Sequence, residues 1–247
     1  MVSTKRILNA VACGGFIVIA LCLCVSCSGP ERVAYRAGTS YLPLLEGRTL
    51  QYQEQRAGGA HTYTMMMQFA GGQTTKVYAL KFEGADFGEA TLLSRDSLVV
   101  YSTNDPYTAM EPRGVLPEYR QLWVDASAKV GHSWSDDDTG TKTTFAALES
   151  ITVPAGSYER CYKTLTEARQ ELFDSLAARR DRGELSTRDH EEELERARQV
   201  ITRWFAPGVG LVKEQIGSGI TRVLMQIEKE GTGIVDTTMP VRYELEG

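Results

Sequence analysis

The residue types that most often carry out catalysis or bind metals are few and scattered in this chain. The sequence has 247 residues and three histidines, His61, His132 and His190, which lie far apart. The segment His190–Leu194 reads HEEEL and begins like the zinc motif HExxH, but no second histidine follows one helical turn later. The motifs of a nucleophile elbow and of a phosphate-binding loop are also missing. The sequence therefore predicts no catalytic residue, no metal site and no cofactor.

The acidic loop Asp136–Gly140 is the best candidate for an ion site. Its three consecutive aspartates could donate oxygen ligands to Ca²⁺. Calcium takes about six to eight oxygens, however, and the loop lacks the spacing and the closing glutamate of a calcium-binding loop. We therefore favour a solvated hairpin turn between Trp134 and Phe145.

The cysteines are concentrated at the N-terminus. Four of the five lie within the first 27 residues, and the fifth is Cys161. Cys161 sits in a strand-like run with Tyr158 and Tyr162, and neither a histidine nor a second cysteine is near it in the sequence. These neighbours favour a buried, apolar thiol over a reactive one.

The run Met65–Met67 is the main sign of an apolar ligand site. In a β-strand, the first and third methionines face one side of the sheet and the second faces the other. Methionine adapts to irregular apolar surfaces, so these side chains and nearby aromatic rings could line the concave side of a curved sheet. Ordinary core packing is the interpretation that we favour for the same pattern. The candidate ligand-facing residues are Met65, Met67, Phe69 and Tyr78.

Composition limits the classes of function. The chain has 27 Lys and Arg against 32 Asp and Glu, for a formal net charge of −5. This acidic balance argues against a nucleic-acid-binding protein, which needs a dense basic face. Apolar residues make up 42% of the chain, enough for a real core. The length suits one all-β domain, or one such domain with an insertion.

The first 26 residues have the profile of an export signal. Lys5 and Arg6 precede an apolar run from Ile7 to Val25. The following segment, Leu23–Gly29, resembles the lipobox of bacterial lipoproteins. That resemblance implies cleavage before Cys27 and acylation of this residue with fatty chains such as palmitate. Ser28 after the cysteine implies, by the same resemblance, an outer-membrane anchor facing the periplasm.

Two other interpretations of the N-terminus remain open. Cys24 could be the modified residue, although Leu23 fits the preceding position less well than a small residue would. The apolar run is also nearly long enough to remain as an uncleaved membrane-spanning helix. In the lipoprotein interpretation, residues 27–40 form a polar tether between the membrane and the domain.

From Tyr41 onward the sequence changes to short β-branched and aromatic segments separated by turn residues. This spacing predicts a mainly β domain over 41–247, built as a curved antiparallel sheet or a half-open barrel. Asn104–Glu118 contains three prolines and predicts a long loop, and Asp236–Leu245 predicts an edge strand or a tail. The predicted strands are Thr49–Gln55, Thr62–Phe69, Lys76–Phe82, Ala90–Leu93, Ser97–Ser102, Ser133–Ser135, Lys142–Thr152, Tyr158–Leu165, Trp204–Phe205, Gly210–Gln215 and Thr221–Ile227.

Residues 166–203 predict a helical insertion between two strands. Good helix formers fill Glu167–Ala178, a break follows at Gly183, and Ser186 begins a second helix in a capping-box-like pattern. We favour a helical hairpin, and a single long helix broken at Gly183 is the alternative. An apolar stripe at helical spacing, a candidate contact surface, consists of Leu194, Ala197, Ile201 and Trp204.

Two resemblances extend over the domain. The first is to a broad group of bacterial envelope proteins, and it implies an all-β, curved-sheet fold and an exported location but no activity. Its motifs are Tyr41–Gly47, Val130–Trp134, Ile151–Tyr158 with Cys161, and Trp204–Lys213. Pro207 and Gly208 fit the central positions of a type II turn, so we interpret this signature as structural. The second is to the short helical SHOCT-type module, which implies oligomerisation or protein contact. It covers about thirty residues, and its motif residues lie between Leu172 and Glu191.

These observations lead to two hypotheses of different classes. The first is a non-enzymatic, lipid-anchored envelope protein that contacts another envelope protein, or a second copy of itself, through the charged hairpin. The alternative is a carrier that binds an apolar ligand such as a lipid on the concave face of the sheet. A hydrolase is a third possibility without supporting residues. The expected partners are thus a membrane and a protein, and no nucleic acid.

Overall fold

The computed structural model describes residues 41–72, 75–85, 90–95, 98–102, 120–137 and 139–232. All of these residues belong to one compact unit. The predicted lipidation site Cys27, the tether 27–40, the loop 104–118 and the segment 236–245 lie outside the described residues.

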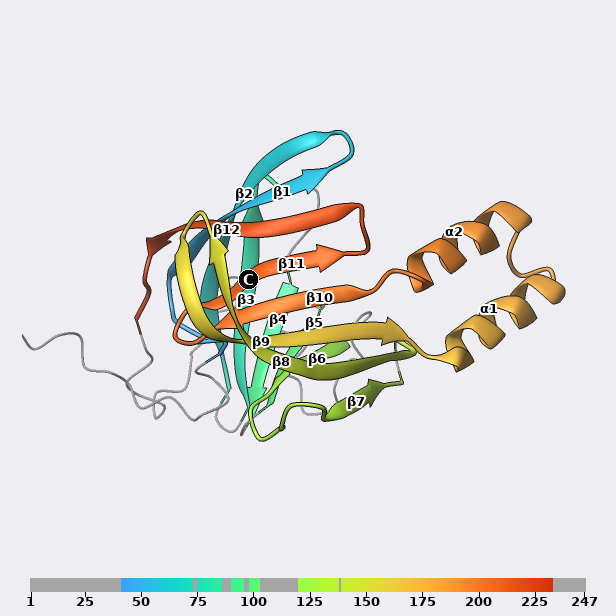
Figure 1. The fold of residues 1–247 in the computed structure, drawn as a ribbon, viewed down its shortest axis with the longest axis horizontal. Helices are drawn as coiled ribbons and strands as arrows, with labels where there is room; N and C mark the ends of the chain where they lie inside the picture. Colours follow the sequence, from blue (N-terminus) through green and yellow to red (C-terminus); the bar gives the residue numbers. More distant parts are fainter. Residues whose placement is uncertain are drawn as a thin grey trace, which may run out of the picture. The chain divides into compact units, whose positions relative to one another are not determined.

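The described strands form one antiparallel sheet in the order β6-β5-β4-β3-β2-β1-β12-β11-β10-β9-β8-β7 (Figure 1). The predicted mainly β fold, a curved antiparallel sheet or half-open barrel, is therefore confirmed as a nearly closed, barrel-like sheet. The strands are β1 (Arg48–Arg56), β2 (Gly59–Gly71), β3 (Lys76–Glu83), β4 (Ala90–Arg95), β5 (Leu98–Ser102), β6 (Arg120–Asp125), β7 (Ser133–Asp136), β8 (Thr141–Val153), β9 (Gly156–Ala168), β10 (Ile201–Ala206), β11 (Gly210–Ile216) and β12 (Ile220–Lys229).

Strand β6 was not among the predicted strands. It follows directly on the proline-rich stretch, and Arg120, Gln121 and Asp125 give it a polar composition. Its pairing with β5 nevertheless extends along its whole length, from Ser102 opposite Arg120 to Leu98 opposite Asp125. Pairing with a neighbouring strand thus outweighs the weak local preference of this segment.

Side chains draw the two edge strands, β6 and β7, toward each other. The indole Nε1 of Trp134 on β7 donates a hydrogen bond to the carbonyl oxygen of Leu122 on β6 at 3.1 Å. The hydroxyl of Tyr162 on β9 donates to the carbonyl of Asp125, at the end of β6, at 2.9 Å. These hydrogen bonds connect β6, at one edge of the curved sheet, with β7 and β9 near the other edge.

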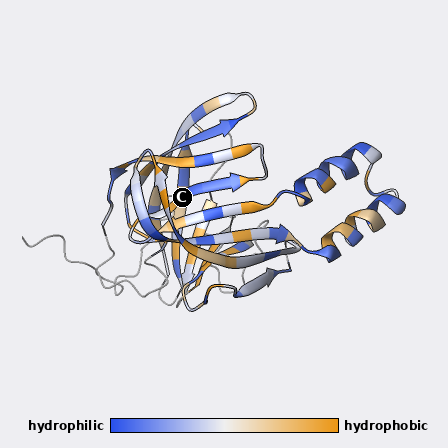
Figure 2. Ribbon diagram, in the orientation of Figure 1, coloured by the Kyte–Doolittle hydropathy of each residue, from blue (hydrophilic) through white to orange (hydrophobic). Residues whose placement is uncertain are grey.

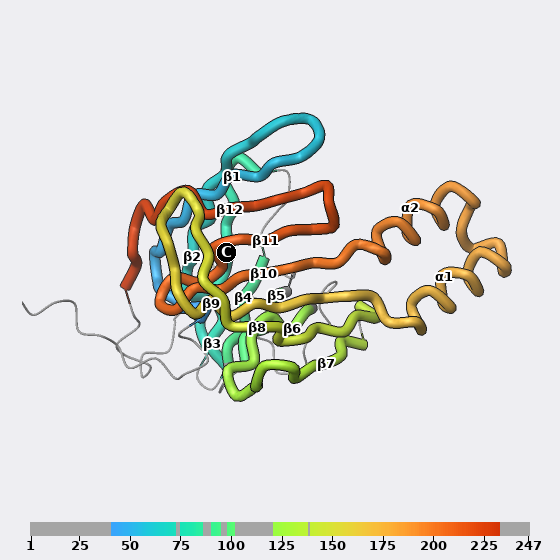
Figure 3. The backbone as a smooth tube through the Cα atoms, viewed as in Figure 1, coloured from blue at the N-terminus to red at the C-terminus, as the bar shows by residue number. Residues whose placement is uncertain are grey.

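The apolar side chains form two buried clusters. The first includes Phe145 and Tyr162, whose rings stack with centroids 3.7 Å apart. The second includes Trp204 and Cys161. Figure 3 shows that the long β8–β9 hairpin bends toward β12 at its tip. At the tip of that hairpin, the amide of Ala155 donates to the carbonyl of Leu224 on β12 at 3.2 Å.

The predicted turns have the expected backbone geometry. Gly208 follows Pro207 between β10 and β11 and has φ of +73°, which a type II turn requires at this position. The acidic loop is the hairpin turn between β7 and β8, as predicted. Asp136 accepts a hydrogen bond there from the amide of Thr139 at 3.3 Å, and Asp137 pairs with Arg169 at 2.8 Å.

The helical hairpin between β9 and β10 is confirmed, with shorter bounds than predicted. Helix α1 spans Gln170–Asp181 and helix α2 spans Thr187–Ala197. Ser186 caps α2 as predicted, since its Oγ accepts a hydrogen bond from the amide of Asp189 at 3.1 Å. Figure 2 shows hydrophilic residues along most of α2. Among the described residues, no helix is long and apolar enough to cross a membrane.

The predicted helical stripe is wrong for its second half. Leu194 and Ala197 belong to α2, whereas Ile201 and Trp204 belong to strand β10. The run from Ile201 to Phe205 is β-branched and aromatic, and it pairs with β9 on one side and β11 on the other. Pairing with two neighbouring strands therefore makes this segment a strand, although its apolar residues continue the helical spacing of Leu194 and Ala197.

Candidate functional site

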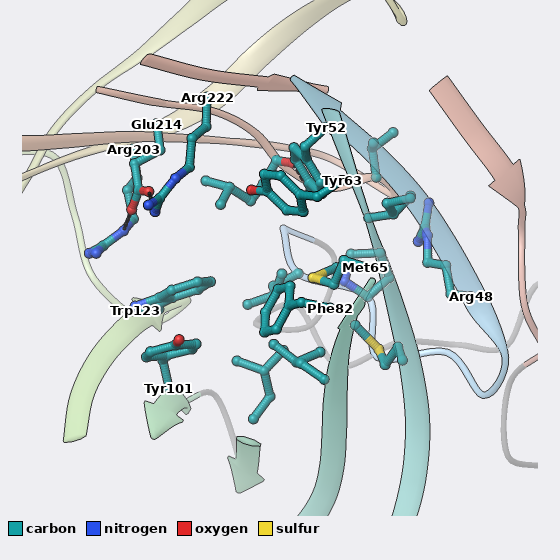
Figure 4. A pocket seen from close by; sticks show the side chains of 18 of the residues that line it. Arg48, Tyr52, Tyr63, Met65, Phe82, Tyr101, Trp123, Arg203, Glu214 and Arg222 are labelled. Atoms are coloured by element: carbon teal, nitrogen blue, oxygen red, sulfur yellow. Dashed lines mark hydrogen bonds and ion pairs between the residues drawn. The ribbon is translucent and has the colours of Figure 1, made fainter. Parts of the chain in front are cut away.

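A cavity of about 390 Å³ lies inside the curved sheet (Figure 4). Its size is within the range of about 300–1,000 Å³ that is typical of small-molecule sites. Most of its wall is apolar, and its charged side chains are three arginines and one glutamate. The lining residues are Leu42, Pro43, Arg48, Leu50, Tyr52, Tyr63, Met65, Met67, Leu80, Phe82, Leu92, Tyr101, Trp123, Ile201, Arg203, Val209, Leu211, Glu214, Ile216 and Arg222.

The period of two along β1 explains how polar and apolar groups come to share this wall. Leu50 and Tyr52 line the cavity, and the same face of the strand continues through the buried Glu54. The glutamines between them lie on the other face and are partly exposed. One strand face therefore passes from the apolar part of the cavity wall into a charged cluster.

An arginine and two aromatic rings form a stack in the wall. The rings of Tyr101 and Trp123 are nearly parallel, at 6°, with centroids 4.5 Å apart. The guanidinium carbon of Arg203 lies 4.8 Å from the centroid of the Trp123 ring, which is within cation–π range. The indole Nε1 of Trp123 is buried and has no hydrogen-bond partner among the described residues.

Arg203 of this stack also belongs to a cluster of charged and polar side chains, called here the charged cluster. Its members are Gln121, Arg203, Glu214, Arg222, Glu54 and Arg56. The Nε of Arg203 donates to Glu214 and its Nη1 donates to Gln121, each at 2.7 Å. Glu214 also accepts from Nη1 of Arg222 at 2.6 Å. The Nε of Arg222 donates to Glu54 at 2.5 Å, and Glu54 also accepts from Arg56. Hydrogen bonds thus link residues of β6, β10, β11, β12 and β1.

The arginines keep the buried carboxylates of the cluster ionised. Burial alone would raise the pKa of Glu214, but the guanidiniums of Arg203 and Arg222 outweigh it and lower the pKa. Glu54 behaves likewise: burial raises its pKa, and the hydrogen bonds from Arg222 and Arg56 lower it by more. The cluster therefore carries three positive and two negative charges at neutral pH.

Two tyrosines supply neutral polar groups to the wall. The rings of Tyr52 and Tyr63 stack with centroids 5.5 Å apart. The hydroxyl of Tyr52 donates to the carbonyl of Leu211 at 2.7 Å. Burial strongly raises the pKa of both phenols, so both stay protonated at neutral pH.

The third arginine of the cavity wall, Arg48, lies apart from the charged cluster. In Figure 4, Arg48 lies across the cavity from Arg203 and Arg222. It is 1% exposed, and its Nη1 and Nη2 donate to the carbonyl of Gly208 at 3.3 and 3.4 Å. Its Nη2 is also 3.5 Å from the carboxylate of Glu230, which is largely exposed.

The structure brings two of the four candidate ligand-facing residues into the cavity wall. Met65 and Met67 line it, whereas Met66 between them is 37% exposed. Phe69 and Tyr78 are not among the lining residues, because they pair across β2 and β3 beyond the cavity, with ring centroids 5.3 Å apart. The strand alternation of the methionines was therefore predicted correctly.

Sequence reasoning missed the charged part of the wall. Glu214 and Arg222 lie on strands that were predicted, whereas Arg203, now on β10, was placed at the end of the helical insertion. None of the three was interpreted as buried. A signal did exist, because β11 places Val212 and Glu214 on one face. A charged side chain on the same strand face as buried apolar residues points inward, so it indicates a buried ion pair.

The remaining candidates lie elsewhere. Cys161 is fully buried, as predicted, and burial raises the pKa of its thiol. His61 lies on β2, His132 precedes β7, and His190 is buried in α2. Within the described part of the chain, no group of three or more His, Cys, Asp or Glu side chains could hold a metal ion.

A second cavity, of about 460 Å³, lies between the helical hairpin and the sheet. Leu172 and Leu176 of α1 line it together with Ala197 of α2 and Gln121 of β6. Ile201 lines both cavities. The hairpin thus borders the end of the sheet at which the charged cluster lies.

Comparisons with known proteins give a likeness to solved structures. No family model matches the sequence, and no curated protein matches it. Among solved structures, the chain is similar to a protein from Parabacteroides distasonis described as a "putative lipoprotein". The match has a TM-score of 0.36 and 13% sequence identity, and it covers 76% of this chain and 98% of that one. The two folds superpose loosely, so the proposals below depend on the residues of this chain alone.

Proposed function

We propose that this protein binds an elongated apolar ligand inside its barrel-like sheet. The observation that carries the proposal is the 390 Å³ cavity, in which Met65, Met67 and aromatic rings surround a few polar groups. Protein interiors are normally packed with few voids larger than a water molecule. A largely apolar cavity of this size, with its polar groups gathered at particular places, is the usual form of a small-molecule site.

A binding role fits the cluster better than a catalytic one. Glu214 accepts hydrogen bonds from both Arg203 and Arg222, and Glu54 accepts from Arg222 and Arg56. Carboxylates held in this way are stabilised as anions and are poor proton acceptors at neutral pH. We therefore propose a non-enzymatic protein, attached to a bacterial envelope through a lipid on Cys27.

The protein-contact role of the helical hairpin stays a prediction. The four residues of its expected contact stripe are divided between α2 and β10, and Trp204 is only 7% exposed. Lys163 and Lys213 lie over the Trp204 ring, 5.2 and 4.9 Å from its centroid. Of the two hypotheses, the cavity therefore favours ligand binding.

The ligand proposal is tested with a fluorescent apolar probe, N-phenyl-1-naphthylamine, and the mature domain 28–247 purified without its lipid. Met65→Glu places a charge in the cavity wall, and Met66→Glu places the same charge on the exposed neighbour. We expect the probe to bind the parent and Met66→Glu alike, and at least about tenfold more weakly to Met65→Glu, because an unpaired charge is costly in an apolar site.

Circular dichroism of each variant checks that it folds. If Met65→Glu fails to fold, Met65→Trp takes its place, since it fills the cavity without adding a charge. A parent domain that does not bind the probe would contradict the proposal. Equal binding by the parent and by a folded cavity variant would contradict it as well.

A further inference from the structure

The charges beside the apolar cavity are balanced by the protein itself. Glu214 lines the cavity and forms ion pairs with Arg203 and Arg222, at 2.7 and 2.6 Å. Arg222 also pairs with Glu54 at 2.5 Å. These four mostly buried groups carry two positive and two negative charges, so their charges cancel. Arg56, the other cation of the charged cluster, is 44% exposed and does not line the cavity.

The remaining charged side chain of the wall, Arg48, has partners as well. Its Nη2 lies 3.5 Å from the carboxylate of Glu230, and its Nη1 and Nη2 donate to the carbonyl of Gly208. A charged group on the ligand would therefore add an unbalanced charge to a largely apolar cavity, and such a charge is costly. The wall thus favours a ligand without net charge.

One hydrogen-bond donor of the wall is nevertheless available to a ligand. Arg203 is 5% exposed and lines the cavity, and its Nε and Nη1 donate to Glu214 and Gln121. Its Nη2 has no hydrogen-bond partner among the described residues, and unlike the Nε1 of Trp123 it is not completely enclosed. Donors at buried places are normally hydrogen-bonded, so this nitrogen indicates an acceptor in the cavity. Because Glu214 already balances the charge of Arg203, a neutral oxygen is the acceptor that fits.

We propose that the ligand is an uncharged amphiphile of the fatty-ester type, whose carbonyl oxygen accepts a hydrogen bond from Arg203. Its apolar chain lies along Phe82, Met65 and Met67, which line the same cavity. This inference rests on the proposed apolar-ligand function and adds the chemical class of the ligand.

The charge of the ligand is tested with methyl decanoate and decanoate, each in competition with N-phenyl-1-naphthylamine for the parent domain at neutral pH. In the parent, methyl decanoate should bind at least about tenfold more tightly than decanoate, because the carboxylate brings an unbalanced charge. In Glu214→Gln, decanoate should gain about tenfold, because Arg203 then lacks its carboxylate and can pair with that of the ligand. Methyl decanoate should bind this variant as it binds the parent.

Glu192→Gln is the matched control. It removes the same charge from the chain, but Glu192 is 46% exposed on α2 and does not line the cavity. We expect it to keep the preference of the parent. If Glu214→Gln does not fold, Glu54→Gln takes its place, since it removes a negative charge from the same four groups.

The hydrogen bond to the carbonyl is tested by infrared spectroscopy, which requires no variant. The ester carbonyl absorption of bound methyl decanoate should shift to lower wavenumber than in hexane, as a hydrogen-bonded carbonyl does. In the double variant Arg203→Met/Glu214→Gln, which removes both members of the ion pair and keeps the charges balanced, the shift should disappear. If the double variant does not fold, the shift in the parent decides alone.

The outcomes separate this inference from the proposed function. If decanoate binds the parent as tightly as methyl decanoate, or gains nothing in Glu214→Gln or its replacement, the apolar-ligand function stands and the uncharged class is wrong. An unshifted carbonyl absorption, or a probe that binds while methyl decanoate does not, would contradict the ester. If neither compound binds and the probe does not bind either, the proposed function itself fails.

Discussion

Glu214 shows how a single buried carboxylate can become dependent on its neighbours. It is 3% exposed, and an isolated charge at such a place would be strongly unfavourable. Two guanidiniums, from Arg203 on the neighbouring strand β10 and Arg222 on the neighbouring strand β12, compensate for its lost hydration. The stability of the folded domain therefore depends on both of these contacts.

This dependence predicts a loss of stability in acid. The pKa values of Glu54 and Glu214 are below the ordinary value of 4.5 in the folded protein. Their contribution to the free energy of unfolding is thus complete above that value and is lost as the pH falls through the lower, folded pKa. Urea denaturation across this range should show stability falling as both groups are protonated.

Glu214→Gln tests the origin of that fall. At neutral pH it should cost about 3 kcal/mol, because it leaves two guanidiniums facing a neutral group. Its stability should then change less with acid than that of the parent. Glu192→Gln, on the exposed face of α2, is the control and should keep the parent's pH dependence. Parallel acid profiles for the parent and Glu214→Gln would contradict this account.

At the residue level, the sequence predicts which face of the sheet a side chain occupies wherever the two-residue period of a single strand determines it. Met65 and Met67 face the cavity while Met66 faces out, as an alternation of two requires. Arg203 could not be placed in the same way. Its burial depends on Gln121 and Glu214, which are far from it in sequence or on another strand, and local pattern says nothing about such partners.

At the level of elements, local signals decided where α2 begins, and strand pairing decided where β10 begins. The Ser186 cap is formed within one helical turn, so the sequence displays it directly. The start of β10 at Ile201 is determined by Thr166 on β9 and Ile216 on β11. The predicted insertion therefore extended too far at both ends, since β9 continues to Ala168.

These bounds predict that the helical hairpin can be removed without unfolding the sheet. Thr166 pairs directly with Ile201, so a short Gly/Ser turn in place of 170–199 can join β9 to β10 as an ordinary hairpin. The residues that line the 390 Å³ cavity belong to strands, to the segment before β1 or to the β10–β11 turn, and none belongs to α1 or α2. Cooperative unfolding and probe binding should therefore both survive the deletion.

The same deletion tests the protein-contact role of the hairpin. If the hairpin mediates self-association or holds an envelope partner, the shortened domain should lose that assembly in sedimentation or pull-down experiments while keeping its ligand. A deletion variant that keeps every partner would remove the contact hypothesis. One that no longer folds would show instead that the sheet requires contacts from the hairpin, such as the packing of Leu172 against Gly140 in the β7–β8 turn.

At the level of the whole molecule, the sheet closes through contacts that no local pattern contains. Strands β1 and β12, near opposite ends of the described chain, pair along Thr49–Gln55. Side chains of Trp134 and Tyr162 then fasten the free edge at β6. The alternation of strands and turns predicted a curved antiparallel sheet, but which strands meet, and hence the existence of a lumen, depends on pairing across the whole chain.

The last prediction concerns how the molecule is held at a membrane. In the lipoprotein interpretation, the protein extracted from membranes should begin at residue 27 and carry the added mass of its acyl chains. Cys27→Ala should abolish incorporation of a labelled fatty acid, and Cys24→Ala, which changes a cysteine three residues earlier, should not. A single acyl chain binds membranes only marginally, so stable anchoring requires more than one. Intact mass and fatty-acid labelling decide among the alternatives. Incorporation that depends on Cys24 would make Cys24 the lipidation site. A chain that keeps its first 26 residues without added mass would show an uncleaved helical anchor.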